Sequence, residues 1–446
     1  MSVDVAPAPR AATEFVGRPR QLVQLLRAGS TTPERLRRVA AGLVVGCLLS
    51  ALTSVLGGLA HTDAVHDSGT RIAALDSDAA ELYRSLADAN ATATRGYVSG
   101  GLEPAAVRAR YDDDVARAAN RLVQAASRLP VGDPAAVPVT TIGDQLPVYT
   151  GLMETARTYN RQGLPLGQSY LGSASRLMRS TILPAAEELR RMQTEALAAA
   201  YQRGGAIPFA VLSIGVAVLA GMVDHAVLEQ RRTNKVVNAG LLAAAAAVVA
   251  ALLWWVVAVA VARDRLDGAR QHSDAAIALD DARAAVLQAR SNESLVLVAR
   301  SGSAGSSEQG FATQAEHVLG PDGHGGLLAD AVRSAPGSAA RVEGIRTALE
   351  GWRGAHRHVR ELDDGGQYQQ AVASVTGADP AGSGAAFERL DAALGSAIEV
   401  ERGAFTVADG RADAALTGLT TGPAVLALIA AGLVTAGIGR RVGEYR

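Results

Sequence analysis

Four apolar runs, each long enough to cross a lipid bilayer, constrain this chain more than any other feature of its sequence. A membrane-spanning helix needs about 20 residues at about 1.5 Å each. The four predicted spans are residues 39–60, 206–227, 236–262 and 419–438. The first run is too long for a signal-peptide core and starts too far along the chain, so we expect it to be retained. The chain is therefore predicted to be a multi-pass protein of the plasma membrane.

Arginine-rich segments near these runs predict the side of the membrane on which each part lies. Three segments are short and basic: the N-terminal arm (1–38), a link (228–235) and the C-terminal tail (439–446). Short basic segments favour the cytoplasm, so we expect both termini and the link, with Arg231 and Arg232, to be cytoplasmic. The two long segments, residues 61–205 and 263–418, are then predicted to be extracytoplasmic.

Both long segments are predicted to be helical. A stripe of apolar residues at three- and four-residue spacing indicates one buried helix face in the first segment: Ile72, Leu75, Ala79, Leu82 and Leu86. Glycine and proline clusters mark the expected breaks: 99–104, 130–138, 163–167, 301–307, 320–326, 363–366 and 376–384. Four helices result for residues 61–205, which predicts an up-down four-helix bundle. The middle helices of residues 263–418 are less sharply defined.

An internal match suggests that the two long segments are copies of one another. Asn90–Gly100 reads NATATRGYVSG and Asn292–Gly302 reads NESLVLVARSG, with the asparagine, the serine and the last glycine identical at an offset of 202 residues. The match falls at the same distance from equivalent spans, which favours a duplication. The predicted fold class is an all-α integral membrane protein with four transmembrane helices and two extracytoplasmic helical-bundle domains arranged as a tandem duplication.

The sequence carries no motif that predicts catalysis. It has no phosphate-binding glycine loop, no zinc-protease motif and no nucleophile elbow. His356 and His358 are two residues apart, so on a helix they would not share a face to bind a metal. The single cysteine, Cys47, lies in an apolar run, and the formal net charge of −1 does not favour nucleic acid. We therefore expect no enzyme activity, no cofactor, no metal and no nucleic-acid partner.

A few polar residues remain as candidates for interaction. Asn90 and Asn292 occupy equivalent places within apolar helix faces, where an asparagine either sets the register between helices or contacts a ligand. Gly100 and Glu103 belong to the first turn after the predicted outer helix, and Gly302 ends the corresponding stretch. Because a helix of this length reaches about 50 Å, these turns are expected to lie far from the membrane.

A polar pair and two arginines form the inner candidates. Asp224 and His225 lie at the inner end of the second predicted span, where such a pair either meets lipid headgroups or acts as a switch. Arg231 and Arg232 follow in the basic link. The segments predicted to be cytoplasmic are too short to fold into a catalytic domain, so any output has to come from a separate protein.

The order of span, helical domain, span and short basic link, followed by a second set, resembles the actinobacterial GlnX-type membrane proteins. The stretches Ser85–Tyr111 and Ala289–Gly302 resemble that family most. The resemblance implies a relay of amino-acid availability from an external GlnH-type solute-binding lipoprotein to a cytosolic serine/threonine kinase of the PknG type. The outer bundles would contact the lipoprotein, and the basic inner segments would contact the kinase and membrane lipid.

Two other functions remain open from the residues alone. The chain could be a direct small-molecule receptor with chemoreceptor-like four-helix ectodomains, which a pocket with convergent arginines would favour. It could instead be a structural assembly factor of the cell envelope, which would show no ligand-dependent change. A homo-oligomer is compatible with each of these functions.

Overall fold

The computed structural model describes eight ranges of the chain: residues 32–67, 73–100, 103–204, 209–233, 238–299, 304–377, 379–416 and 421–443. These ranges are almost entirely helical and contain no strand. They fall into two compact units. The span unit lies within Met1–Asp63, Ala206–Ala262 and Ala414–Arg446, and the bundle unit within Ala64–Gly205 and Arg263–Asp413.

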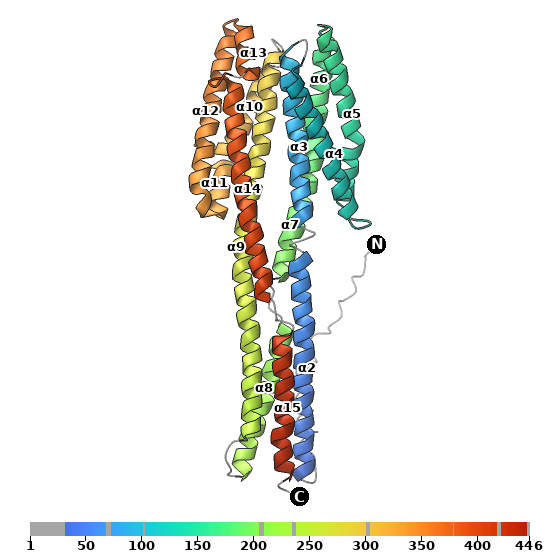
Figure 1. Cartoon of the computed structure of the whole chain (residues 1–446), viewed down its shortest axis with the longest axis vertical. Coiled ribbons are helices and arrows are strands. Elements are labelled where there is room, and N and C mark those ends of the chain that lie inside the picture. The colour runs from blue at the N-terminus through green and yellow to red at the C-terminus, as the bar shows by residue number, and fades with distance from the viewer. Residues whose placement is uncertain are drawn as a thin grey trace, which may run out of the picture. The chain divides into compact units, whose positions relative to one another are not determined.

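The span unit holds four helices that are long and apolar enough to cross a membrane. They are α2 (Thr32–Asp67), α8 (Phe209–Thr233), the first part of α9 (Ala239–Ala299) and α15 (Gly422–Gly443) (Figure 1). Large apolar side chains such as Leu48, Leu52 and Leu428 point outward and are about half exposed. An apolar outer surface of this extent suits contact with lipid. The four helices coincide with the four predicted spans, and the chain is compatible with a multi-pass membrane protein.

Small residues let helices of the span unit approach one another closely. Gly240 on α9 and Gly437 on α15 are in contact, since a Cβ added at Gly240 would lie 2.6 Å from Cα of Gly437. Beside them, Nδ2 of Asn238 donates a hydrogen bond to the carbonyl of Gly437 at 3.0 Å. Close glycine contacts and polar side chains are the usual means of joining helices in lipid.

The first half of the bundle unit, as we call residues 73–204, contains five α-helices and one π turn. They are α3 (Ala73–Val98), α4 (Ala105–Arg128), α5 (Ala136–Arg161), α6 (Leu166–Leu177), the π turn (Met178–Ile182) and α7 (Leu183–Gly204). The breaks before α4, α5 and α6 fall at the predicted glycine and proline clusters, whereas the π turn between α6 and α7 was not predicted. α3 packs against α4 and α7, and α5 packs against α6.

The second half of the bundle unit, residues 263–413, is less regular. It contains the last part of α9, α10 (Ala304–Leu319), α11 (Gly326–Ser334), a 3-10 turn (Pro336–Ser338), α12 (Ala339–Asp364), α13 (Tyr368–Thr376) and most of α14 (Ser383–Leu416). Most of the breaks were predicted. The break at 335–338 was not, although Pro336 within it is a common helix-starting residue.

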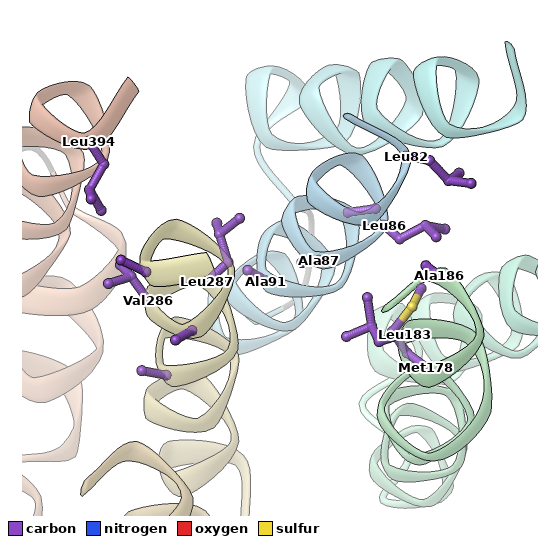
Figure 2. Close-up of a cluster of buried hydrophobic side chains, with 14 of the residues drawn as sticks. Leu82, Leu86, Ala87, Ala91, Met178, Leu183, Ala186, Val286, Leu287 and Leu394 are labelled. Atoms are coloured by element: carbon purple, nitrogen blue, oxygen red, sulfur yellow. The ribbon is translucent and has the colours of Figure 1, made fainter. Parts of the chain in front are cut away.

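A single apolar core runs through both halves of the bundle unit. The predicted stripe on α3 is confirmed at four positions: Leu75, Ala79, Leu82 and Leu86 are at most 4% exposed. Ile72, its first member, lies outside the described residues. Figure 2 shows α3 flanked by α7 and α9, with Leu86 of α3 and Leu287 of α9 in the same cluster. The two segments that the sequence presents as separate bundles therefore share one hydrophobic core.

Candidate functional site at the seam between the two halves

The seam, as we call the surface where α3 meets α9, joins the two halves of the bundle unit through side-chain hydrogen bonds. Nε2 of Gln288 donates to the hydroxyl of Tyr83 at 2.7 Å. Further along both helices, Nδ2 of Asn90 donates to Oγ of Ser291 at 2.9 Å. Asn90 and Ser291 are both buried, at 3% and 1% exposure. A hydrogen bond that is shielded from water in this way favours one register of α3 against α9.

Both helices of the seam are buried on every side where they meet. Residues 89–94 of α3 and 289–297 of α9 are buried without exception. Several of the buried side chains are small, among them Ala87 and Ala91 of α3 (Figure 2). The distance between packed helices depends on the side chains at their contact, and small ones allow a close approach with shallow interlocking. The hydrogen-bonded polar pairs therefore do much to fix the position of α3 along α9.

The second predicted asparagine, Asn292, contacts the first half through the π turn. Its Oδ1 accepts a hydrogen bond from Nη1 of Arg179 at 2.8 Å. Arg179 lies within the π turn Met178–Ile182. Pro184 follows this turn and has no N–H for a regular helical hydrogen bond, which favours a wider turn just before it. The structure thus places Asn90 at the seam and Asn292 beside it, and each joins α9 to the first half through a different partner.

A cluster of charges, which we call the charged rim, borders the seam on its exposed side. It consists of Asp88 and Arg95 on α3, Arg110 on α4 and Glu388 on α14. Arg110 bridges the halves, since it contacts Asp88 at 3.2 Å and Glu388 at 3.4 Å. Arg95 also reaches Glu388, at 3.1 Å. The Glu388 side chain is 46% exposed, so these pairs are screened by water and are individually weak.

A second polar cluster, the buried ion network, lies inside the second half directly beside the seam. Glu293 of α9 is 0% exposed, forms an ion pair with Arg290 and accepts a hydrogen bond from the hydroxyl of Ser383. It also contacts Nδ1 of His356 at 3.2 Å, and Nε2 of His356 contacts Glu308 at 3.1 Å. The network therefore ties α9, α10, α12 and α14 together. A buried charge is tolerated only when it is paired and hydrogen-bonded in this manner.

Aromatic side chains enclose the buried ion network. Nε1 of Trp352 donates to Oγ of Ser383 at 3.0 Å, and the ring of Phe311 stacks on His356 with a centroid distance of 3.8 Å. The guanidinium of Arg290 lies over the Phe387 ring, 5.0 Å from its centroid. A cation over an aromatic face is further stabilised when both are removed from water.

The pKa values within the network are shifted so that the ions persist. Burial by itself would raise the pKa of Glu293, but Arg290 and His356 outweigh it and lower that pKa to about 2. Burial would lower the pKa of His356, but its hydrogen bonds to Glu293 and Glu308 raise it to about 9. The hydrogen bond from His356 also lowers the pKa of Glu308. His356 is therefore protonated at neutral pH and acts as a cation between two carboxylates.

Gly100 and Glu103 lie at the end of α3, away from the asparagines. Gly100 has a φ of +67°, a conformation that favours glycine and that ends the helix. Glu103 forms an ion pair with Arg157 of α5 at 2.9 Å and packs against Gly96, where an added Cβ would collide with its carboxylate. Glu103 is thus held in place by specific contacts, and neither it nor Gly100 takes part in the seam.

The remaining predicted residues are not brought to the seam. Asp224 and His225 lie on α8 in the span unit, the first exposed and the second half-buried. Arg231 and Arg232 belong to the last turn of the same helix. Gly302 lies outside the described residues, as do residues 1–31 of the N-terminal arm and residues 234–235 of the link. Within the described ranges, no cluster of histidine, cysteine or carboxylate side chains could hold a metal ion.

The sequence analysis missed the buried ion network and the partner of Asn292. Arg290 and Glu293 are three residues apart and are the only charged residues between 284 and 299, which was a signal for a buried i,i+3 ion pair. His356 was considered only as a metal ligand and not as an ion-pair partner. Arg179 had no clear sequence signal beyond the nearby Pro184.

A comparison with known proteins finds a family match that covers the first half. Residues 64–202, which include almost all of α3 to α7, match the family described as the actinobacterial sensor domain. No curated protein and no solved structure matches the chain. The match assigns the chain a role in sensing or signalling, and it places Asn90, Arg110 and Arg179 within the sensor domain.

Proposed function

We propose that this chain is a transmembrane signal relay, which couples amino-acid sensing outside the cell to a cytosolic serine/threonine kinase. Sensing would occur through a solute-binding lipoprotein that contacts the bundle unit. The sensor-domain match supports the sensing role, and the resemblance to GlnX-type proteins supplies the two partners. In this proposal the bundle unit is extracytoplasmic, and both termini and the basic link are cytoplasmic.

The continuity of α9 is the observation that carries the proposal. This one helix of 61 residues includes a candidate span and also Gln288, Ser291 and Asn292 of the seam. A change at the seam can therefore be passed along a single helix. Small shifts of packed helices are an established way to transmit a signal between distant sites. The shallow contact between α3 and α9 favours such a shift, and the hydrogen-bonded asparagines set its resting position.

In this proposal, the predicted interaction residues lie at the lipoprotein-binding and kinase-binding ends of the relay. Gly100 and Glu103, at the end of α3, would offer a surface to the lipoprotein. Arg231 and Arg232 offer positive charge to the kinase and to lipid headgroups. Asp224 and His225 lie near the proposed inner surface, where a helix shift would change their surroundings. The chain itself would perform no catalysis, and its assembly as a homo-oligomer is compatible with the relay.

Crosslinking in native membranes tests the relay. The tagged full-length chain would be crosslinked, solubilised in detergent and purified, and its partners identified by mass spectrometry. We expect to recover an amino-acid-binding lipoprotein together with a serine/threonine kinase. Recovery of neither partner would overturn the relay. A chain that shows no ligand-dependent change in its crosslinks would instead act as a structural factor of the envelope.

A variant at the seam tests how the signal is passed. The double substitution Asn90→Ala and Asn292→Ala should leave both partners bound but abolish the response of kinase activity to external amino acids. Glu399→Gln, an exposed position on α14, serves as the matched control and should respond like the wild type. A normal response in the double variant would show that the seam does not carry the signal.

A further inference from the structure

A recess of about 310 Å³ lies beside the seam, and side chains from both halves of the bundle unit line it. Its volume is near the lower end of the range for small-molecule pockets. The lining residues are Glu81, Arg84, Ser85 and Asp88 of α3, Arg117 of α4 and Arg283 of α9. All six are polar or charged, so a ligand for this recess must itself be polar.

Two of the arginines face the recess from opposite halves. Arg84 of α3 is 23% exposed in its side chain and pairs with Glu81, one turn earlier on the same helix. Arg283 of α9 is 16% exposed and holds Asp391 through Nε and Nη2, at 2.6 and 2.8 Å. Burial lowers the pKa of Arg84, and the neighbouring positive charge of Arg283 lowers it further. An anion between these two guanidinium groups would relieve their repulsion.

Ser85 supplies a second, independent indication of a ligand. The residue is 2% exposed, and its hydroxyl has no hydrogen-bond partner among the described residues. A buried hydroxyl that has lost its water and gained no partner is unfavourable and rare. Ser85 also lines the recess, so rotation of its side chain would let a bound molecule supply the missing hydrogen bond.

The balance of charge narrows the class of ligand. The lining carries three guanidinium groups, from Arg84, Arg117 and Arg283, and the two carboxylates of Glu81 and Asp88. Asp114 and Asp391, outside the lining, pair with Arg117 and Arg283, so the recess offers both signs of charge. A planar guanidinium matches a carboxylate in a two-pronged hydrogen bond. The two lining carboxylates would repel a dianion such as sulfate or phosphate, and they can accept hydrogen bonds from a hydroxyl or ammonium group.

We propose that this recess is a binding site for a small polar carboxylate that also carries a hydrogen-bond donor. Its carboxylate would lie between Arg84 and Arg283, and its hydroxyl or ammonium group would face Asp88. Because α3 and α9 each supply one arginine, the ligand would join the two halves and stabilise the resting seam. This site makes the chain a direct receptor, and it does not rest on the lipoprotein relay.

Four three-carbon probes test the site in the purified full-length chain. Glycerate and serine each combine a carboxylate with a donor on the neighbouring carbon, 3-hydroxypropionate lacks that donor, and serinamide lacks the carboxylate. Binding would be measured by calorimetry and by the shift in thermal unfolding temperature, because a ligand of the folded state raises that temperature. We expect glycerate and serine to bind, 3-hydroxypropionate to bind more weakly and serinamide not to bind.

Substitutions then locate the binding. Arg84→Gln should weaken binding by about tenfold or more, the effect expected on losing a charge-assisted hydrogen bond. Arg117→Gln, at a half-exposed position, should weaken it less. Arg191→Gln is the matched control, since Arg191 pairs with Glu188 on its own helix as Arg84 does with Glu81, but it does not line the recess.

Three results would overturn the proposal. Failure of both glycerate and serine to bind would mean that the recess is only a charged cleft. Equal binding to wild type and to Arg84→Gln would place the site elsewhere. Sulfate that competes as well as glycerate would show a general anion site. None of these outcomes affects the recovery of the lipoprotein and kinase, so the relay and this site can fail separately.

Discussion

α3 and α9 present asparagines at matching positions of the predicted internal repeat, yet their surroundings differ. At the offset of 202 residues, Asn90 matches Asn292, but Ala91 matches Glu293 and Asp88 matches Arg290. On α9 the two charged residues form a buried ion pair, whereas on α3 an alanine is packed and Asp88 joins the charged rim. If the halves are copies, the residues around the matching asparagines have diverged at the surface where the halves meet.

A similar contrast separates one buried carboxylate of the first half, Asp78, from one of the second half, Glu293. In the first half the buried carboxylate of Asp78 pairs with Arg121 and Arg128, whose side chains are 40% and 39% exposed. In the second half Arg290 and Glu293 are 2% and 0% exposed. An exposed arginine can return to water when its partner is lost, and a buried one cannot. We therefore expect the ion pairs of the second half beside the seam to resist rearrangement and those of the first half to adjust more easily.

The largest expected effect comes from breaking the buried ion network. Glu293→Gln leaves the charge of Arg290 buried without its anion, so we expect a loss of about 3–5 kcal/mol in the free energy of unfolding. Asp78→Asn is the counterpart in the first half and should cost about 1 kcal/mol or less, because its arginine partners can be hydrated. Chemical denaturation of the full-length chain in detergent measures both. Equal losses would remove the distinction between a rigid and an adjustable half.

The second-largest expected effect is a pH dependence of the free energy of unfolding that arises from His356 in the second half. The pKa of His356 is about 9 in the folded chain against an ordinary value of 6.5. Because the folded value is the higher one, its contribution is complete below about pH 6.5 and is lost as the pH rises to about 9. We expect a loss on the order of 3 kcal/mol across that window.

His356→Gln provides the control for this window. Burial raises the pKa of Asp281, and that of Asp114, to about 7. Their contributions to the free energy of unfolding are therefore lost as the pH rises from about 4 to about 7, below the window of His356. The substitution at His356 should therefore flatten the profile only above neutral pH. A profile that is unchanged above pH 7 would mean that His356 is not protonated in the folded chain.

Local pattern in the sequence was enough to predict most of the fold. Apolar runs of sufficient length identified the four spans, and glycine and proline identified most helix ends, because both depend on neighbouring residues only. The stripe from Leu75 to Leu86 was found for the same reason. Pro336 shows the limit, since a proline that starts a helix and one that merely lies in a loop look alike without their context.

The candidate site depends on contacts that local pattern does not contain. The contact of Asn90 with Ser291 joins residues 201 positions apart, and that of Arg179 with Asn292 joins residues 113 positions apart. Predicting them requires the register of α3 against α9 and the extra residue in the π turn. The sequence indicated that the asparagines were buried and equivalent, and it could not indicate that their partners differ.

The third-largest expected effect is a difference in stability between variants of the two asparagines. Asn292→Ala removes the acceptor of a charged donor, Arg179, whose own pKa is lowered by burial. Hydrogen bonds to charged groups contribute more than neutral ones, so we expect a cost of about 2 kcal/mol. Asn90→Ala removes a neutral hydrogen bond to Ser291 and should cost about 1 kcal/mol. Thermal unfolding of the two single variants compares them directly, and a larger loss for Asn90→Ala would show that the neutral hydrogen bond, and not the charged one, holds the two halves together more strongly.

The smallest effect is expected at the charged rim. Glu388→Gln removes the negative charge shared by Arg95 and Arg110, but the pairs are exposed, so the cost should be about 0.5 kcal/mol or less and should decrease with added salt. Glu399→Gln on the same helix is the matched control. The rim is nevertheless one of the contacts that bridges the halves, and its removal should make the seam easier to shift. Faster hydrogen exchange in α3 of Glu388→Gln, at nearly unchanged stability, would show that the rim controls movement. A loss as large as that of Glu293→Gln would instead make the rim part of the rigid core.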